Sequence, residues 1–285
     1  MSCGVSTMSL YRYIETQLFQ PPRPLLHYPY GLAKDEDCHV SELCLRIYEQ
    51  TGVPSVCHLH PNPLYTVVYS HGNAESLNTL GWYLREVSSL LQANVFAYEY
   101  EGYFVDHRRS QTPQPTEAAC FSSAEKFLDA IKDVSPYPIV LLGYSMGAAV
   151  TLHAAQVHKQ HKMPHAVVLL APFVSAASTV LARRSFMVSL SPLWSWPDVF
   201  VMRTAALEQG HATFIAHGSN DNVIPVAHGQ AIARWVDKHS KRCKFVEIPE
   251  ADHASIRLFK DLYQDLSAFL ESLGSSRLTA EVTEV

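Results

Sequence analysis

The feature that most constrains the fold of this chain is the pentapeptide Gly-Tyr-Ser-Met-Gly at residues 143–147. An apolar run over residues 138–142 precedes it, and the small residues 148–150 follow it. This context predicts a strand, a sharp turn and a helix, with the Ser145 hydroxyl projecting above the sheet from a strained backbone. The flanking glycines leave room where a Cβ would collide with a neighbouring element. Ser145 is therefore predicted to be a nucleophile, and an ordinary glycine-rich turn is the alternative.

A nucleophilic serine needs an imidazole to take its proton and an acid to fix the tautomer of that imidazole. Asp221 stands just past the short apolar strand predicted over residues 212–216, and His253 follows the strand predicted over residues 244–248. Open α/β sheets gather catalytic groups at the carboxyl ends of their strands. We therefore expect Ser145, Asp221 and His253 to meet at one edge of the sheet. Their order along the chain is that of the α/β-hydrolase fold.

Other acids and histidines compete for these two roles. Asp198 follows no recognisable strand, and Glu250 is too close to His253 in the sequence. Asp221 itself could be only a turn residue, because Asn-Asp-Asn is good loop chemistry. Most of the other fourteen histidines lie on polar or helical stretches, and only His253 has the position that the triad requires.

Acyl transfer also needs donors for a tetrahedral oxyanion, and fixed backbone N–H groups can contribute about 3–4 kcal/mol each. One expected donor is the N–H of Met146, directly after the nucleophile. The second is assigned to the N–H of Asn73, in the His-Gly-Asn loop that follows the apolar strand predicted near residues 66–69. The alternative is that this loop is merely a turn after a strand.

Several further motifs carry a family resemblance, which covers roughly residues 38 to 270. They occupy residues 70–75, 98–103, 115–117, 217–224 and 251–253. Together they resemble the alpha/beta-hydrolase-domain palmitoyl-protein thioesterases and their Bem46-like relatives. The resemblance implies a serine hydrolase acting on acyl thioesters or esters, with Ser145, Asp221 and His253 as its triad.

The sequence departs from that family in two places. A bulky, basic loop over residues 104–110 replaces a short serine-rich link, and we expect it, with Phe104, to lie near the rim of the active site. The depalmitoylating members carry a dense N-terminal cysteine cluster for lipid attachment, whereas here Cys3 stands alone. Cys3 is therefore the candidate lipidation site. The segment from Tyr11 to Phe19 either lies on a membrane surface or packs on the domain.

The expected architecture is an α/β-hydrolase fold with an about eight-stranded, mostly parallel sheet and helices on both faces. Residues 1–37 form an N-terminal extension with a short amphipathic helix over residues 11–19. Residues 38–272 form the catalytic domain, which opens on an antiparallel hairpin with strands at 40–48 and 56–60.

A cap-like segment is expected at about residues 172–210, and residues 273–285 are expected to be a disordered tail. The cap-like segment is rich in aromatic and aliphatic side chains, including Phe173, Trp194 and Trp196. These residues either line a pocket for an acyl chain, where each buried CH₂ contributes about 0.8 kcal/mol, or simply pack the crossover onto the sheet.

Composition agrees with one catalytic domain, since 47% of the 285 residues are hydrophobic and 17% are charged. A net charge of -5 argues against a nucleic-acid partner. No secretory signal opens the chain, no run approaches the ~18 apolar residues of a membrane span, and the six cysteines are dispersed. We therefore expect a cytoplasmic protein, with any peripheral membrane contact made through the N-terminus. No dinucleotide or phosphate-binding loop and no metal-ligand spacing is present, so no cofactor or metal is expected.

Three functions remain open at this stage. The first is a (thio)esterase whose substrate is an acylated protein or a small lipid-like ester. The second is a serine peptidase of the prolyl-oligopeptidase or proline-aminopeptidase type, which uses the same fold and triad. The sequence shows no clear group of acidic residues that would bind the amine of a peptide. The third is a catalytically silent scaffold, which usually loses the serine or the histidine that this chain keeps. The oligomeric state does not follow from the sequence.

Overall fold

The computed structural model describes residues 15–16, 18–29, 40–158, 164–181, 198–202, 210–238, 240 and 242–282. Within these ranges, no helix is both long enough and apolar enough to cross a membrane. The candidate lipidation site Cys3 and the candidate pocket residues Trp194 and Trp196 lie outside the described residues.

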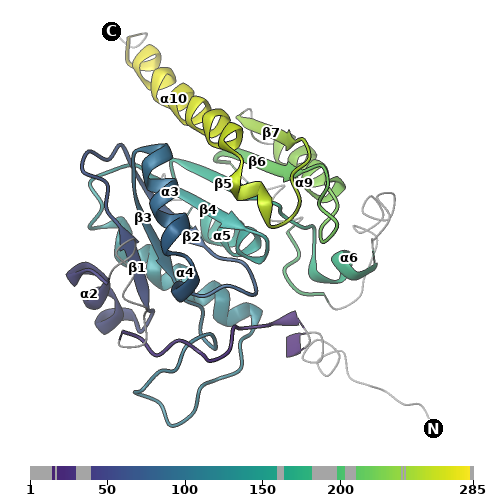
Figure 1. Cartoon of the computed structure of the whole chain (residues 1–285). Coiled ribbons are helices and arrows are strands. Elements are labelled where there is room, and N and C mark those ends of the chain that lie inside the picture. Colours follow the sequence, from purple (N-terminus) through teal and green to yellow (C-terminus); the bar gives the residue numbers. More distant parts are fainter. Residues whose placement is uncertain are drawn as a thin grey trace.

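One seven-stranded sheet forms the centre of the domain, with the strand order β1-β3-β2-β4-β5-β6-β7 (Figure 1). Only the pair of β1 with β3 is antiparallel, and the other neighbours are parallel. The α/β fold and its mostly parallel sheet are therefore as predicted, with seven strands instead of about eight. The strands are β1 (Ser55–His58), β2 (Tyr65–Ser70), β3 (Ala93–Tyr98), β4 (Ile139–Tyr144), β5 (Ala166–Leu170), β6 (Ala212–Gly218) and β7 (Cys243–Ile248).

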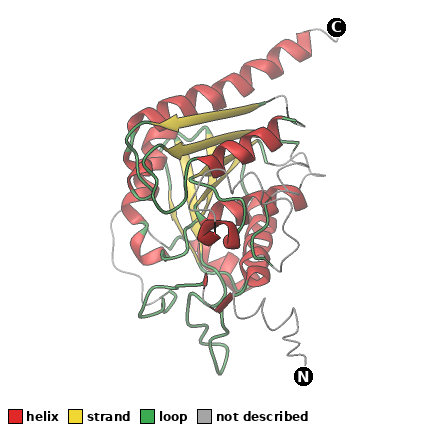
Figure 2. Ribbon diagram, turned by 90° about the vertical axis from the view of Figure 1, so that its right-hand side faces the viewer, coloured by secondary structure: helices red, strands yellow, loops and turns green. Residues whose placement is uncertain are grey.

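Helices cover both faces of the sheet, so its central strands are buried throughout (Figure 2). This double coverage explains why β4 and β5 read as continuous apolar runs instead of alternating patterns. The side chains of each strand alternate between two cores; Val68 enters one and Val67 the other. One core is closed by α2 (Glu42–Thr51), α4 (Glu117–Lys132), α5 (Met146–Val157) and α9 (Ala227–Asp237), and the other by α3 (Gly81–Leu91) and α10 (Lys260–Val282).

The predicted strand over residues 40–48 is wrong, because this segment begins helix α2. The Ser41 side chain caps the helix by accepting a hydrogen bond from the Cys44 N–H, at 3.2 Å. Gly52 ends it with a φ of 77°, a left-handed conformation that favours glycine. Cys44 and Ile47 are the buried positions, and their spacing of three is that of a helix face. There is consequently no opening hairpin, and β1 joins the sheet edge on its own.

The predicted disordered tail over residues 273–285 is also wrong as far as the structure describes it, because α10 continues to Val282. Gly274 does not end the helix, and an added Cβ there would meet nothing within 4 Å. The last turns project beyond the sheet (Figure 1).

The N-terminal segment runs along the domain instead of standing apart from it. Glu15, Thr16 and Leu18 are helical, in agreement with the predicted short helix before Pro21. Further on, the Leu26 carbonyl accepts a hydrogen bond from the Val105 N–H at 2.8 Å. The two short helical turns η1 (Leu77–Thr79) and η4 (Ser255–Leu258) and the short helix α6 (Ala176–Leu181) complete the described elements.

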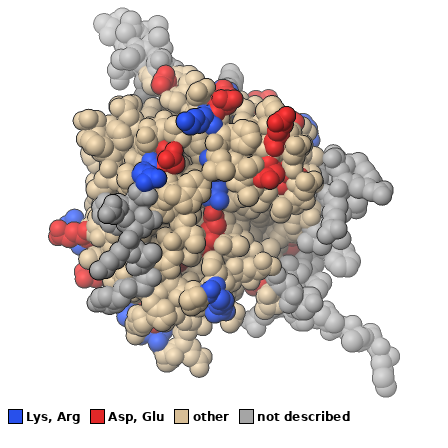
Figure 3. Space-filling model, viewed as in Figure 1, with Lys and Arg blue, Asp and Glu red and all other residues tan. Residues whose placement is uncertain are grey.

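Acidic and basic side chains alternate over the face seen in Figure 3, with broad uncharged areas between them. The charge on this face is therefore mixed in sign, in keeping with the modest net charge of -5.

Candidate active site

Ser145 occupies the turn between β4 and α5, as the pentapeptide predicts. Its φ is 54° and its ψ is -119°, an unfavourable conformation for a residue with a side chain. Gly143 and Gly147 make the turn possible by their lack of a Cβ. A Cβ at Gly147 would lie 2.0 Å from the Ser70 carbonyl oxygen, and one at Gly143 would lie 2.3 Å from the Gly147 carbonyl oxygen.

The structure brings the three predicted triad residues together. His253 Nε2 lies 3.0 Å from Ser145 Oγ, and His253 Nδ1 lies 2.7 Å from Asp221 Oδ2. The Asp221 side chain is fully buried and that of His253 is 16% exposed. These are the separations at which a base can take the serine proton while an acid orients the base.

The Asp221 carboxylate is fixed by the turn that follows β6. Its Oδ1 accepts the backbone N–H groups of Val223 at 2.9 Å and Ile224 at 2.7 Å. Its Oδ2 also lies 3.4 Å from Nε2 of the buried His217. Burial by itself raises the pKa of Asp221, but the hydrogen bonds from His217 and His253 outweigh it and hold that pKa well below the usual range. Asp221 is therefore a carboxylate at any working pH.

The two rival acids are occupied elsewhere. Asp198 Oδ1 accepts the backbone N–H groups of Ala177 and Val199, each at 2.8 Å. Glu250 is exposed at the turn before His253 and has a φ of 63°. Among the described residues, neither carboxylate contacts His253, whereas Asp221 meets it directly.

Asn73 and Met146, the predicted oxyanion donors, line the same cavity as Ser145. Within the described chain, neither backbone N–H donates a hydrogen bond to another protein group. The turn that carries Asn73 is closed by Glu75, whose Oε2 accepts the Gly72 N–H at 2.7 Å. That these two N–H groups form an oxyanion hole stays a prediction.

A partly buried ion pair joins this turn to the loop of His253, a link that the sequence reasoning missed. Arg257 Nη1 lies 2.7 Å from Glu75 Oε1, and its guanidinium stacks 4.1 Å from the centre of the Tyr144 ring. The Tyr144 hydroxyl in turn donates to the His253 carbonyl at 2.8 Å. No spacing in the sequence relates Glu75 to Arg257, because 182 residues separate them.

The cavity at Ser145 has a volume of about 340 Å³ and a largely apolar wall. Phe173, a predicted pocket residue, lies in this wall together with Met146 and Ile224. Leu18, from the N-terminal segment, lines it as well and was not among the predicted pocket residues. The amphipathic pattern near Leu18 was the available signal, but it does not say which surface the helix covers.

Asn73 also holds the N-terminal segment against the site. Its side-chain Nδ2 donates to the Leu18 carbonyl at 2.6 Å, and its Oδ1 accepts the Gln20 N–H at 3.0 Å. The Tyr103 hydroxyl donates to the same Oδ1 at 2.7 Å. The Asn73 side chain therefore anchors one wall of the cavity that Asn73 itself lines.

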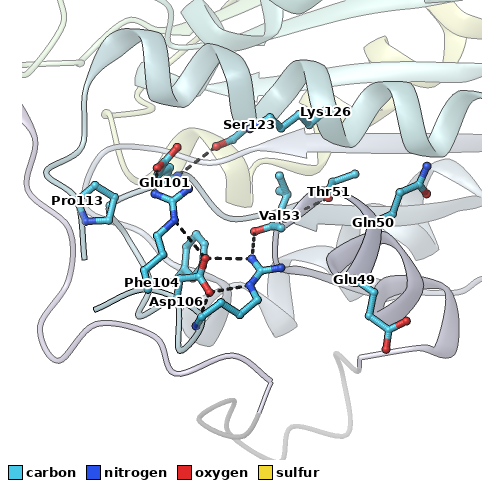
Figure 4. A pocket seen from close by; sticks show the side chains of 14 residues that line it. Glu49, Gln50, Thr51, Val53, Glu101, Phe104, Asp106, Pro113, Ser123 and Lys126 are labelled. Carbon is cyan, nitrogen blue, oxygen red and sulfur yellow. Dashed lines mark hydrogen bonds and ion pairs between the residues drawn. The ribbon is translucent and has the colours of Figure 1, made fainter. Parts of the chain in front are cut away.

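The predicted place of Phe104 at the active-site rim is wrong. Phe104 lines a different cavity of about 360 Å³, between α2 and the loop after β3, which shares no lining residue with the cavity at Ser145 (Figure 4). The basic residues of the loop are paired there with acids. Arg108 Nε lies 2.8 Å from Asp106 Oδ1, and Arg109 pairs with Glu101 and Asp106. Arg108 also contacts α2, where it donates to the Gly52 carbonyl at 3.4 Å and lies 4.5 Å from the centre of the Tyr48 ring, so the loop packs on α2.

Among the described residues, no three His, Cys, Asp or Glu side chains come together as a metal site. The arrangement around Ser145 instead places the serine hydroxyl, an imidazole and a buried carboxylate at hydrogen-bonding distances beside the cavity that Asn73 and Met146 line.

Comparison with known proteins agrees with this fold. The model of the Alpha/beta hydrolase family matches residues 67–207. A protein of Acanthamoeba polyphaga mimivirus, whose name places it among the alpha/beta hydrolases, is 26% identical over 250 residues, 85% of this chain and 87% of its own. Alpha/beta hydrolase domain-containing protein 17C of Mus musculus is 24% identical over 215 residues, which are 74% of this chain but only 61% of the mouse protein.

Solved structures show the same architecture. An esterase of Pyrococcus furiosus superposes with a TM-score of 0.59 at 18% identity, covering 78% of this chain and 85% of its own. An esterase of the bacterial hormone-sensitive lipase family superposes with a TM-score of 0.59 at 15% identity, covering 94% of this chain and 91% of its own. The chain has the alpha/beta-hydrolase fold, and its relatives are named as alpha/beta hydrolases.

Proposed function

We propose that this protein is a serine hydrolase that cleaves acyl esters or thioesters with the triad Ser145, His253 and Asp221. The observation that carries the proposal is the continuous hydrogen-bonded chain from Ser145 Oγ through the His253 ring to the Asp221 carboxylate. It starts at a serine that the backbone holds in a strained turn above the sheet.

The reaction follows from this chain of contacts. His253 Nε2 takes the Ser145 proton as Oγ attacks the acyl carbonyl carbon, and Asp221 stabilises the imidazolium that forms. The backbone N–H groups of Asn73 and Met146 receive the oxyanion. His253 then returns the proton to the departing thiolate or alkoxide, which leaves an acyl-serine. Water, deprotonated by the same imidazole, attacks this acyl-serine and releases the carboxylic acid and free Ser145.

The wall of the cavity supports an acyl substrate. Leu18, Phe173 and Ile224 present apolar surface beside Ser145, and burial of each CH₂ of an acyl chain contributes about 0.8 kcal/mol. The resemblance to the palmitoyl-protein thioesterases points to an acylated protein, whereas the solved structures named as esterases point to a small lipid-like ester. Both substrates present the same acyl carbonyl to the triad.

The observations favour neither alternative. A silent scaffold has no need of a serine, an imidazole and a carboxylate at hydrogen-bonding distances. A peptidase of the aminopeptidase type needs a free acid for the peptide amine. Glu75 is the acid that lines this cavity, and it is already paired with Arg257.

The decisive variant is Ser145→Ala. We expect it to abolish covalent labelling by a fluorophosphonate and to lower turnover of an acyl thioester by ~10³-fold or more, while the protein stays folded. Ser267→Ala, which removes an exposed hydroxyl on α10, serves as the control and should label as wild type does. Turnover of Ser145→Ala near the wild-type rate would refute the assignment, and a preference for aminoacyl amides over thioesters would favour the peptidase.

A further inference from the structure

We propose that His71 is a positioning residue of the oxyanion hole: as an imidazolium held between Glu99 and the Gly72 carbonyl, it fixes the peptide plane that presents the Asn73 N–H. The proposal rests on the proposed function, because it concerns the oxyanion formed by attack of Ser145. Neither His71 nor Glu99 touches the substrate, and both side chains are fully buried behind the loop.

The orientation of the Asn73 N–H follows from the contact on the other side of its peptide group. His71 Nδ1 lies 2.8 Å from the Gly72 carbonyl oxygen. The peptide bond between Gly72 and Asn73 is trans, so its C=O and N–H point in opposite directions. A donor that holds the carbonyl toward His71 therefore turns the Asn73 N–H away from His71, and Asn73 lines the cavity at Ser145.

The partners of the ring show that both nitrogens donate. The Gly72 carbonyl can only accept, so Nδ1 carries a proton. On the other side, Nε2 lies 2.8 Å from Glu99 Oε1. The two oxygens of Glu99 also accept the backbone N–H groups of Tyr100 at 3.2 Å and Leu77 at 3.1 Å, so the side chain of Glu99 acts as an acceptor in each of these contacts. We infer that it accepts from Nε2 as well and that the ring is charged.

The electrostatic surroundings support this charge. Burial lowers the pKa of His71, but the Glu99 carboxylate, the Gly72 carbonyl and Glu75 outweigh it and leave the pKa raised above its ordinary value. The rings of Tyr100 and Tyr103 pack on the imidazole with centroids 4.2 Å and 5.7 Å away. Burial raises the pKa of both phenols, so they stay neutral.

The sign of the pH dependence follows from the raised pKa. The stabilisation by the His71 imidazolium is complete below the pKa of an unfolded histidine, near 6.5, and is lost as the pH rises through the higher pKa of the folded state. Loss of this proton removes the charge-assisted bond to Glu99 and frees the Gly72 peptide group. We therefore expect kcat to fall on the alkaline side of its pH profile.

Glu99→Gln and His71→Gln test the proposal in turnover of an acyl thioester between about pH 6 and pH 10. Glu99→Gln is expected to lower kcat by about 10–10²-fold with little change in KM, because an oxyanion donor acts in the transition state. It should also move the alkaline limb of the kcat profile to lower pH. His71→Gln keeps a neutral donor that does not titrate, so the limb should disappear.

His158→Gln is the matched control. His158 is buried and also stands between a carbonyl, Ala154 O at 2.9 Å, and a carboxylate, Asp129 Oδ1 at 3.1 Å, but it lies at the contact of α4 with α5. The kcat of His158→Gln and the pH profile of this kcat should match those of wild type. Folded Glu99→Gln and His71→Gln proteins with the wild-type kcat and alkaline limb would overturn the proposal.

A second measurement uses the wild-type protein alone, in case the variants do not fold. The ¹⁵N spectrum of the His71 ring at neutral pH should show both nitrogens protonated, and a neutral ring would overturn the proposal. Failure of wild type to react with a fluorophosphonate would instead overturn the proposed function. The ring spectrum then still decides the charge of His71, so the two failures are distinguishable.

Discussion

In the proposed triad, the orienting role of Asp221 depends on the donors that contact its carboxylate. Two backbone N–H groups hold Oδ1, and His253 and His217 face Oδ2. The carboxylate cannot rotate without breaking several of these contacts, so the His253 ring is held with its Nε2 toward Ser145. The tautomer of the base is therefore set by the turn after β6 as much as by the acid itself.

Replacement of this acid by its amide tests that role. Asp221→Asn should leave His253 in place but favour the wrong tautomer, and turnover of an acyl thioester should fall by up to ~10⁴-fold. Asp198→Asn is the control, because its carboxylate only accepts backbone N–H groups near α6. A larger loss of turnover in Asp198→Asn than in Asp221→Asn would show that the acid has been misassigned.

At the scale of residues, the proximity of Ser145, Asp221 and His253 could be predicted because each of them follows a strand that ends in a polar loop. Leu18 and Arg257 could not be predicted in this way. Both reach the site through contacts between segments far apart in the sequence, and such contacts leave no spacing to detect. Phe104 was misplaced for the same reason, since its loop packs on α2 through contacts of Arg108 with the distant Gly52 and Tyr48.

At the scale of elements, the turn between β4 and α5 depends on close approach of backbones. β2 is held by hydrogen bonds to β3 and β4, so the Ser70 carbonyl cannot retreat from a side chain added at Gly147. The close packing of β2 against the start of α5 therefore requires a residue without a Cβ at position 147.

Two glycine substitutions measure this constraint. Gly147→Ala should reduce the free energy of unfolding by at least the ~1–3 kcal/mol typical of overpacked cores. Gly274→Ala, in an open position on α10, should raise it by roughly 0.5–1 kcal/mol, because alanine favours a helix over glycine. Chemical denaturation of both variants provides the comparison, and wild-type stability of Gly147→Ala would contradict the close packing.

The error over α2 has a definite physical cause. Residues 40–48 contain apolar side chains that read equally well as a short strand or as one face of a helix, and short apolar runs are ambiguous in this respect. The Ser41 cap and the left-handed Gly52 decide in favour of the helix. The central strands were easier to assign, because their apolar runs are short, contain β-branched residues and are bounded by turns.

At the scale of the whole molecule, we propose a cytoplasmic enzyme that reaches lipid substrates through its N-terminus. The four described cysteines, Cys44, Cys57, Cys120 and Cys243, form no disulfides, which suits a reducing compartment. A single acyl chain on Cys3 would give only weak, reversible membrane binding. The segment after it would have to add a second contact.

Fractionation of cells that express wild type and Cys3→Ser tests this attachment. Wild type should divide between membrane and soluble fractions, and Cys3→Ser should shift toward the soluble fraction. Cys243→Ser, which removes a half-buried thiol on β7, is the control and should distribute as wild type does. Equal and fully soluble distribution of all three proteins would rule the anchor out.

The hydrogen bonds of Asn73 with Leu18 and Gln20 have a practical consequence for the use of tags on this enzyme. A fusion partner at the amino end is attached to the segment that forms one wall of the cavity at Ser145. Displacement of this segment would change the shape of the cavity and with it the rate of turnover. The far end of α10 points away from the sheet and carries no part of the triad (Figure 1). Reporter labels and surface tethers therefore belong at the carboxyl end, where they leave the chemistry untouched.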